Sequence, residues 1–246
     1  FLAAVSHELR TPLNAILGWT TLARQANEPA RSSAALDVVE RNGRVLSQLV
    51  EDLLDLGRVA HGQFRLEPST LNLADVVRAA ADSVRPAAET KRIHVELEYG
   101  SNVPPIVGDA IRLQQVVWNL LWNAVKFTPE RGRVSVRMRA DGRLSGDRRA
   151  IESAVELEVT DSGRGISPEL LPHIFDPFRQ GDHDPSRRNG GLGLGLAIVK
   201  HLVELHGGSV SAHSGGLECG ATFRVRLPSA EQTEREQRSF DAAVSV

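Results

Sequence analysis

Two separate groups of residues in this sequence have the types and spacing of a phosphoryl-transfer site. His7 is followed directly by Glu8 near the start of the chain, in a segment with helical periodicity. An imidazole with a pKa of about 6.5 is mostly neutral at pH 7, so one ring nitrogen keeps a free lone pair while a neighbouring carboxylate accepts the proton of the other. Far downstream, the glycine-rich run 190–196 leads into an apolar helix, where unpaired backbone N–H groups favour a phosphate. Taken alone, His7 is more often an ordinary surface histidine, but together the two groups indicate a histidine nucleophile and a nucleotide site.

A predicted helix over residues 109–127 carries a second set of polar residues. Asn119 and Asn123 are four residues apart and share one face, with Lys126 beside them. Amide oxygens are suitable hard ligands for Mg²⁺, and a lysine neutralises phosphate charge. Hydrogen bonds from both asparagines to neighbouring backbone are an equally good interpretation of this helix by itself.

The segment from Asp161 to Gly165 follows a predicted strand at residues 155–159. By itself this pattern is more often a turn than a nucleotide site, but it also has the features of a base-binding loop. Its glycines allow the backbone to pass close to a ligand. A carboxylate at a strand's end can accept a hydrogen bond from the exocyclic amine of adenine, whereas guanine presents a carbonyl there, so Asp161 favours ATP over GTP.

The glycine-rich run does not match the common phosphate-binding motifs. The pattern GxxxxGK[ST] is absent. A dinucleotide fingerprint requires a strand directly before the glycines, whereas this run follows a polar stretch at 181–189. We interpret residues 181–189 as a lid.

Three regions must position these residues. Residues 1–60 contain two amphipathic helices, the first over 1–26 with a bend expected at Pro12, the second capped by Ser32 or Ser33. A hairpin of this kind leaves its apolar stripes exposed, so we expect it to pair with a second copy in a dimeric four-helix bundle. A hinge is expected near residues 57–62.

Beyond the hairpin, residues 61–228 alternate short strands with helices and predict an α/β sandwich. A long hairpin loop is expected at 140–154, and residues 229–246 are expected to be a polar linker or tail. The strands are predicted at 93–99, 134–138, 155–159 and 221–227, and the helices at 73–90, 109–127 and 194–206.

Composition limits the partners. The 246 residues are 41% hydrophobic and 24% charged with a net charge of −2, which gives no electrostatic case for nucleic acid or anionic membrane. The single cysteine, Cys219, excludes an internal disulfide and fits a reducing cytoplasm. No apolar run approaches the roughly 20 residues that span a bilayer. The sequence lacks an initiator Met and opens inside a helical pattern, so we expect a fragment whose upstream sensor or membrane segment lies outside it.

The order of these motifs resembles the transmitter core of two-component sensor histidine kinases. The resemblance extends over residues 1–228 and rests on His7-Glu8-Leu-Arg-Thr11-Pro-Leu, on Asn119 to Thr128, on Asp161 to Gly165, on Phe175-Asp-Pro-Phe178 and on the glycine-rich run. It implies a dimerisation and phosphoacceptor hairpin followed by an ATP-binding domain of the gyrase, chaperone and histidine kinase superfamily. It also implies Mg²⁺, a homodimer, and transfer of the phosphoryl group to an aspartate of a response-regulator receiver domain.

The resemblance also implies a role for each matching residue. His7 is the phosphoacceptor and Glu8 its base, while Thr11 resembles the threonine that orients water in a phosphatase reaction, although an exposed helix threonine is the alternative interpretation. At the phosphates, the resemblance implies Asn119 and Asn123 with magnesium, Lys126 as a phosphate contact, and the glycines Gly191, Gly193 and Gly195. At adenine it implies Asp161, Gly163 and Gly165. Phe175 and Phe178 would lie at the base of the lid, and Thr222, late in the sequence, would contact the pocket.

Two other functions are compatible with the same superfamily. An ATP-hydrolysing conformational machine carries a glutamate where this chain has Asn119, and an amide cannot act as a general base. A catalytically silent dimeric scaffold would not need intact motifs. The sequence therefore favours an active kinase.

Overall fold

The computed structural model describes residues 2–25, 29–60, 65–144, 151–179 and 192–235. The chain forms two compact units, one of Phe1–Phe64 with Asp176–Gly195 and the other of Arg65–Phe175 with Leu196–Val246. None of the described helices is long and apolar enough to cross a bilayer. In chain order the elements are α1 (Leu2–Gln25), α2 (Pro29–Ala60), β1 (Ser69–Leu71), α3 (Leu73–Thr90), β2 (His94–Tyr99), β3 (Ile106–Gly108), α4 (Ala110–Phe127), β4 (Arg133–Leu144), β5 (Ile151–Asp161), the 3₁₀ turn η1 (Leu171–His173), α5 (Gly195–Leu205), β6 (Ser209–His213) and β7 (Ala221–Pro228).

In the first unit, α1 and α2 pack against each other as a helical hairpin. α1 continues through Pro12. α2 begins at Pro29 and not at a cap formed by Ser32 or Ser33, because proline at the first helical position lacks only an N–H that would have no partner. α2 continues through Gly57, and its described residues end at Ala60, within the segment 57–62 where we expect a hinge. Several large apolar side chains of the hairpin remain exposed, among them Leu13, Leu17, Leu22, Leu36 and Leu54.

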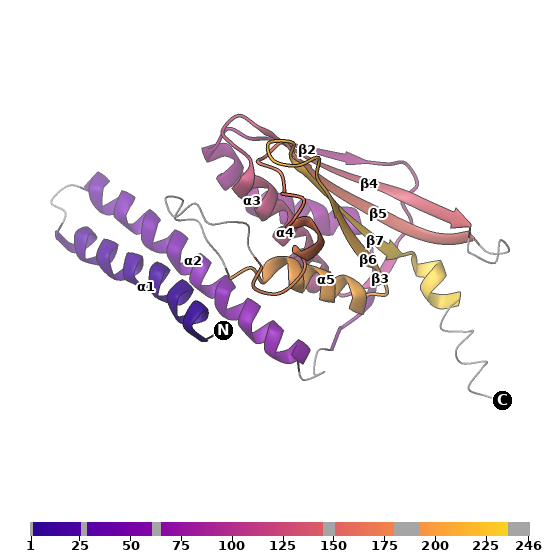
Figure 1. Ribbon diagram of the computed structural model, residues 1–246, viewed down its shortest axis with the longest axis horizontal. Helices are drawn as coiled ribbons and strands as arrows, with labels where there is room; N and C mark the ends of the chain where they lie inside the picture. Colours follow the sequence, from indigo (N-terminus) through magenta and orange to yellow (C-terminus); the bar gives the residue numbers. More distant parts are fainter. Residues whose placement is uncertain (1, 26–28, 61–64, 145–150, 180–191, 236–246) are drawn as a thin grey trace. The chain divides into compact units, whose positions relative to one another are not determined.

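The second unit contains a five-stranded sheet in the order β2-β4-β5-β7-β6. β2 and β4 are parallel and the other pairs are antiparallel. Figure 1 shows α3, α4 and α5 on one face of this sheet. That face and the helices bury the apolar core, which includes Val134, Val136, Val155, Leu157, Val225, Val77, Leu120 and Leu202.

Local signals explain where the helices begin. Asn72 caps α3 by accepting a hydrogen bond from the Ala74 N–H, and the Asp109 side chain accepts from Ile111 and Arg112 at the start of α4. The predicted bounds of these two helices, 73–90 and 109–127, agree with the observed ones to within a residue. The four predicted strands of the large sheet also lie where the alternation placed them.

Two parts of the second unit differ from the prediction. The stretch 140–154 is not simply a loop, because β4 and β5 remain paired as far as Leu144 and Ile151. Residues 229–235 do not form a free linker: Ser229 donates its N–H to Ser153, Ala230 donates to Pro105, and residues 230–235 are helical. Both differences from the prediction arise from backbone hydrogen bonds to strands or loops that are distant in sequence.

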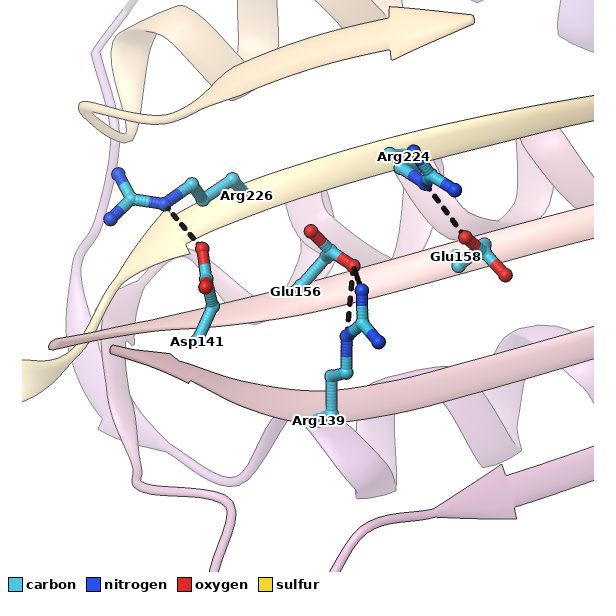
Figure 2. Close-up of polar contacts among 6 residues, drawn as sticks. All are labelled: Arg139, Asp141, Glu156, Glu158, Arg224 and Arg226. Carbon is cyan, nitrogen blue, oxygen red and sulfur yellow. Dashed lines mark hydrogen bonds and ion pairs between the residues drawn. The ribbon is translucent and has the colours of Figure 1, made fainter. Parts of the chain in front are cut away.

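The face of the sheet opposite the helices carries ion pairs between neighbouring strands, and a pair between Arg226 and Asp141 that spans β5. Arg139 Nε lies 3.0 Å from Glu156 Oε1 and Arg224 Nε lies 2.7 Å from Glu158 Oε2 (Figure 2). Arg226 reaches diagonally to Asp141, at 2.9 Å (Figure 2). Opposite charges at cross-strand positions stabilise pairing and register. These ion pairs therefore support the register of the sheet.

Candidate functional site

Asp161 stands at the end of β5, between Val134 of β4 and Ala221 of β7. The residue is 8% exposed, and its Oδ1 accepts a 2.8 Å hydrogen bond from the Gly163 N–H. Burial raises the pKa of Asp161, although the N–H groups of Gly163 and Ala221 act in the opposite direction. A nearly buried carboxyl with free acceptor capacity suits a ligand that donates a hydrogen bond, as an exocyclic amine does.

The two glycines of this loop are required for different reasons. A Cβ on Gly163 would lie 2.6 Å from the Phe127 carbonyl oxygen, so the position has no space for a side chain. Gly165 has a φ of +70° and a Cβ there would lie 2.0 Å from the Gly216 carbonyl oxygen. The residues that follow Asp161 are thus packed backbone to backbone, which fixes the path of the loop.

Residues 214–220 hold the other side of this loop. Glu218 donates its N–H to the Arg164 carbonyl and Gly220 donates to Gly163. Ser214 Oγ accepts from the Ile166 N–H at 3.0 Å and donates to the Gly220 carbonyl at 2.6 Å. Nothing in the sequence distinguishes Ser214, because a serine before two glycines is typical of any turn.

α4 carries the three polar residues predicted to face a nucleotide. Asn119 is only 5% exposed, and its Nδ2 atom has no hydrogen-bond partner. Asn123 and Lys126 are half-buried. Buried amide groups in folded proteins almost always have partners, so an unsatisfied Nδ2 indicates a ligand or water at this point of α4. The alternative, in which Asn119 is satisfied by neighbouring backbone, fails for this nitrogen.

The C-terminal end of α4 meets the Asp161 loop. The Phe127 carbonyl accepts a 3.3 Å hydrogen bond from the Arg164 N–H, and the guanidinium of Arg164 lies 4.2 Å from the centre of the Phe127 ring. The Lys126 ammonium lies 5.0 Å from the same ring centre. The structure therefore brings the predicted phosphate contact, Lys126, and the predicted adenine contact, Asp161, to one region of the second unit.

The N-terminal end of α4 is fixed by a buried histidine. His206 Nδ1 donates to the Leu202 carbonyl at 2.7 Å, because that oxygen can only accept, and Nε2 accepts from the Asp109 N–H at 3.0 Å. Burial lowers the pKa of His206, against the opposing effects of the Leu202 carbonyl and the Asp109 charge. Both ring nitrogens are used in the neutral form, so His206 joins α5 to the start of α4.

Two further predicted residues lie beside this region. Thr222 on β7 is paired with Thr160, their hydroxyl oxygens 3.1 Å apart, and it directly follows Ala221, the register partner of Asp161. The Phe175 ring makes an edge contact with the ring of buried Phe223, with centroids 6.4 Å apart. Thr222 is therefore next to the Asp161 end of β5, while Phe175 packs against the core.

The remaining predicted residues belong to the first unit. His7 and Glu8 lie on α1, and Thr11 is exposed one turn further along. Phe178 and Gly193 both have positive φ, and the Phe178 N–H donates to the Gly193 carbonyl at 3.1 Å. Gly195 is the first residue of α5. Gly191, and the stretch 181–189 that we interpreted as a lid, lie outside the described residues.

Comparison with known families matches both units. Residues 1–62 match the His Kinase A phospho-acceptor domain, and residues 108–231 match the histidine kinase-, DNA gyrase B- and HSP90-like ATPase family.

Curated relatives point the same way. Over its whole length the chain is 36% identical to an autoinducer 2 sensor kinase/phosphatase, LuxQ, of Vibrio parahaemolyticus, of which it covers 28%. Over 93% of its length it is 34% identical to hybrid signal transduction histidine kinase D of Dictyostelium discoideum, of which it covers 17%. The chain thus spans less than a third of the length of either relative.

Among solved structures, full-length ShkA in complex with AMPPNP matches 93% of this chain and 45% of that one, with a TM-score of 0.65 and 34% identity. The family matches agree with the helical hairpin, with the sheet and its helices, and with the order of the sequence motifs. The chain therefore belongs to the histidine kinase-, DNA gyrase B- and HSP90-like ATPase family and is the transmitter core of a sensor histidine kinase, with a phosphoacceptor domain followed by an ATP-binding domain.

Proposed function

We propose that this core uses ATP to phosphorylate its own His7 and then passes the phosphoryl group to an aspartate of a response-regulator receiver domain. In this proposal residues 1–60 are the dimerisation and phosphoacceptor hairpin, 61–228 the catalytic domain and 229–246 the C-terminal extension. The proposed reaction takes place in the cytoplasm, where ATP is available. The relative in Vibrio parahaemolyticus is described as a sensor kinase/phosphatase, which supports assigning Thr11 to a phosphatase step.

The observation that carries the proposal is the unpartnered Nδ2 of Asn119 on α4. A bound triphosphate with Mg²⁺ and its water shell offers acceptors to such a nitrogen, and the amide oxygens of Asn119 and Asn123 are suitable for the ion. When bound, Mg²⁺ neutralises phosphate charge. In this proposal Lys126 adds a positive charge near the same end of the helix, and Asp161 accepts a hydrogen bond from adenine.

The reaction on the hairpin needs a nucleophile and a proton acceptor. In the proposed step a neutral ring nitrogen of His7 bonds to the γ-phosphorus as the bond to the β-phosphate oxygen breaks, and ADP leaves. Positive charge develops on the ring, and Glu8 accepts the proton of the second nitrogen. Positioning the two reactants supplies most of the rate.

The same site is poorly suited to rapid ATP hydrolysis. Water needs a general base, and the buried α4 side chain at this position is the amide of Asn119. His7 then becomes the evident destination for the phosphoryl group.

We also propose a homodimer. The hairpin exposes large apolar side chains, with Leu17 60% and Leu54 57% exposed. A second copy of the hairpin buries such stripes in a four-helix bundle.

Incubation with γ-labelled ATP and Mg²⁺ tests the proposal. We expect a label that is stable in base and labile in acid, absent from His7→Gln, and strongly reduced in Asn123→Asp, which places a carboxylate beside the phosphates. His213→Gln is the matched control, because His213 is an exposed histidine on β6. Label retained in His7→Gln would overturn the assignment. Mixing His7→Gln with Asn123→Asp protomers shows whether phosphorylation crosses the dimer, since label in the mixture requires transfer between protomers.

A further inference from the structure

A lysine outside the family motifs binds the C-terminal end of α4. Lys91, the residue that follows α3, donates hydrogen bonds from its Nζ to the carbonyls of Val125 and Lys126, both at 2.8 Å, and to that of Thr128 at 3.0 Å. An ammonium has three protons, so all three are used. Burial lowers the pKa of Lys91, and the charge of Glu130 opposes this effect.

These bonds complete the hydrogen bonding of the helix end. The last four carbonyls of an α-helix have no partner within the helix. In α4 the first of them, Ala124, accepts from the Thr128 N–H, and the last, Phe127, accepts from the Arg164 N–H. The two between them, Val125 and Lys126, accept from Lys91. A positive charge at a helix C-terminus is also favourable for the helix dipole.

This helix end connects both halves of the proposed nucleotide site. Asn123 and Lys126 stand on the final turns, and the Phe127 carbonyl is bonded to the loop that follows Asp161. Gly163 packs so closely on the same carbonyl that a Cβ would not fit. A displaced last turn would therefore move the predicted phosphate contact and disturb the predicted adenine contact together.

We propose that Lys91 is a positioning residue of the nucleotide site, which fixes the last turn of α4 by binding the carbonyls of Val125, Lys126 and Thr128. This inference deepens the proposed function and rests on it only in taking α4 as part of the ATP site. Lys91 itself acts through the backbone of α4.

Direct binding of AMPPNP with Mg²⁺ tests the inference without requiring phosphorylation of His7. Trp118 and Trp122 are stacked on α4 with ring centroids 5.5 Å apart, and the only other tryptophan is Trp19 on α1. In a Trp19→Phe background, fluorescence therefore reports on α4. Lys91→Met removes the three donors, Lys91→Arg keeps the charge and several donors, and Arg85→Met is the matched control, an exposed cation of α3 whose ion-pair partner is Asp82 on the same helix.

We expect Lys91→Met to weaken AMPPNP binding by about tenfold, in line with the loss of charge-assisted hydrogen bonds. Lys91→Arg should recover part of the affinity, and Arg85→Met should bind like the parent. The KM for ATP should rise in the same order, while kcat at saturating ATP changes by less than about twofold, because a uniform loss of binding acts on KM. Denaturant unfolding of each variant separates a loss of fold from a loss of binding.

Parent-like AMPPNP binding by folded Lys91→Met would overturn the inference. Equal weakening in Lys91→Met and Lys91→Arg would also overturn it, because the helix end would then not depend on donors at this position. A parent protein that does not bind AMPPNP would refute it together with the proposed function. A parent that binds AMPPNP but does not label His7 would refute the proposed function alone, and the Lys91 series would still decide the positioning role.

Discussion

Stability of the second unit should fall in acid because of His206. The neutral ring donates to Leu202 and accepts from the Asp109 N–H, so a proton on Nε2 would face a donor and leave a buried N–H without an acceptor. Leaving a buried group unsatisfied costs about 1–3 kcal/mol. The native state therefore resists protonation, in agreement with the lowering of the His206 pKa by burial.

The direction of the pH effect follows from proton uptake. The unfolded chain protonates this histidine at a pKa of about 6.5, whereas the native state does so only at lower pH. Below pH 6.5 or so the unfolded state thus binds more protons, and the free energy of unfolding falls by at most about 1.4 kcal/mol per pH unit for this one group. The stabilisation is complete above the unfolded pKa and is lost as the pH falls toward the native pKa.

Denaturant unfolding between about pH 8 and pH 5.5 measures this contribution. We compare the parent with His206→Gln, in which an amide oxygen can accept from Asp109 but does not titrate, and follow Trp118 and Trp122 fluorescence in the Trp19→Phe background. From pH 8 to pH 5.5 the free energy of unfolding of the parent should fall by about 1 kcal/mol more than that of His206→Gln. This difference does not exceed the cost of leaving the buried Asp109 N–H without an acceptor. His213→Gln should run parallel to the parent. Parallel curves for the parent and His206→Gln would refute the reasoning.

Three further predictions concern single sites. Gly163→Ala should lower the free energy of unfolding by about 1–3 kcal/mol and raise the KM for ATP, because the new methyl group would collide with the Phe127 carbonyl. Unchanged denaturation and kinetics would contradict this packing. Gly43→Ala should instead raise helix stability by about 0.5–1 kcal/mol, because Gly43 lies within α2 and nothing lies within 4 Å of the added Cβ. Thermal unfolding measures this gain, and a lower unfolding temperature would contradict it. Asp161→Asn should weaken ATP binding in a titration, yet unfold at an equal or higher denaturant concentration near pH 8. The reason is that burial raises the pKa of Asp161, so keeping this carboxyl ionised at pH 8 opposes folding. A clearly less stable variant would contradict this destabilising effect of the charge.

Much of this protein was accessible from sequence because the signals are local. The helices α3 and α4 begin directly after Asn72 and Asp109, whose side chains accept hydrogen bonds from the first turn of each helix, and the strands around Asp161 alternate in apolar and polar residues. The family motifs likewise depend on short spacings. These features were enough to predict the order of the two units, ATP as the nucleotide and the candidate site residues.

The tertiary structure decided what depends on groups distant in sequence. Strands β1, β3 and β6, the extended β4–β5 hairpin and the docked residues after Pro228 arise from long-range backbone pairing, which a single segment does not encode. Whether Asn119 Nδ2 had a partner depended on its surroundings in the fold. Lys91 resembles any basic residue after a helix, and only folding brings its ammonium to carbonyls 34 to 37 residues away. Sequence thus supplied the chemical groups of this kinase core, and the fold determined which of them hold the others in place.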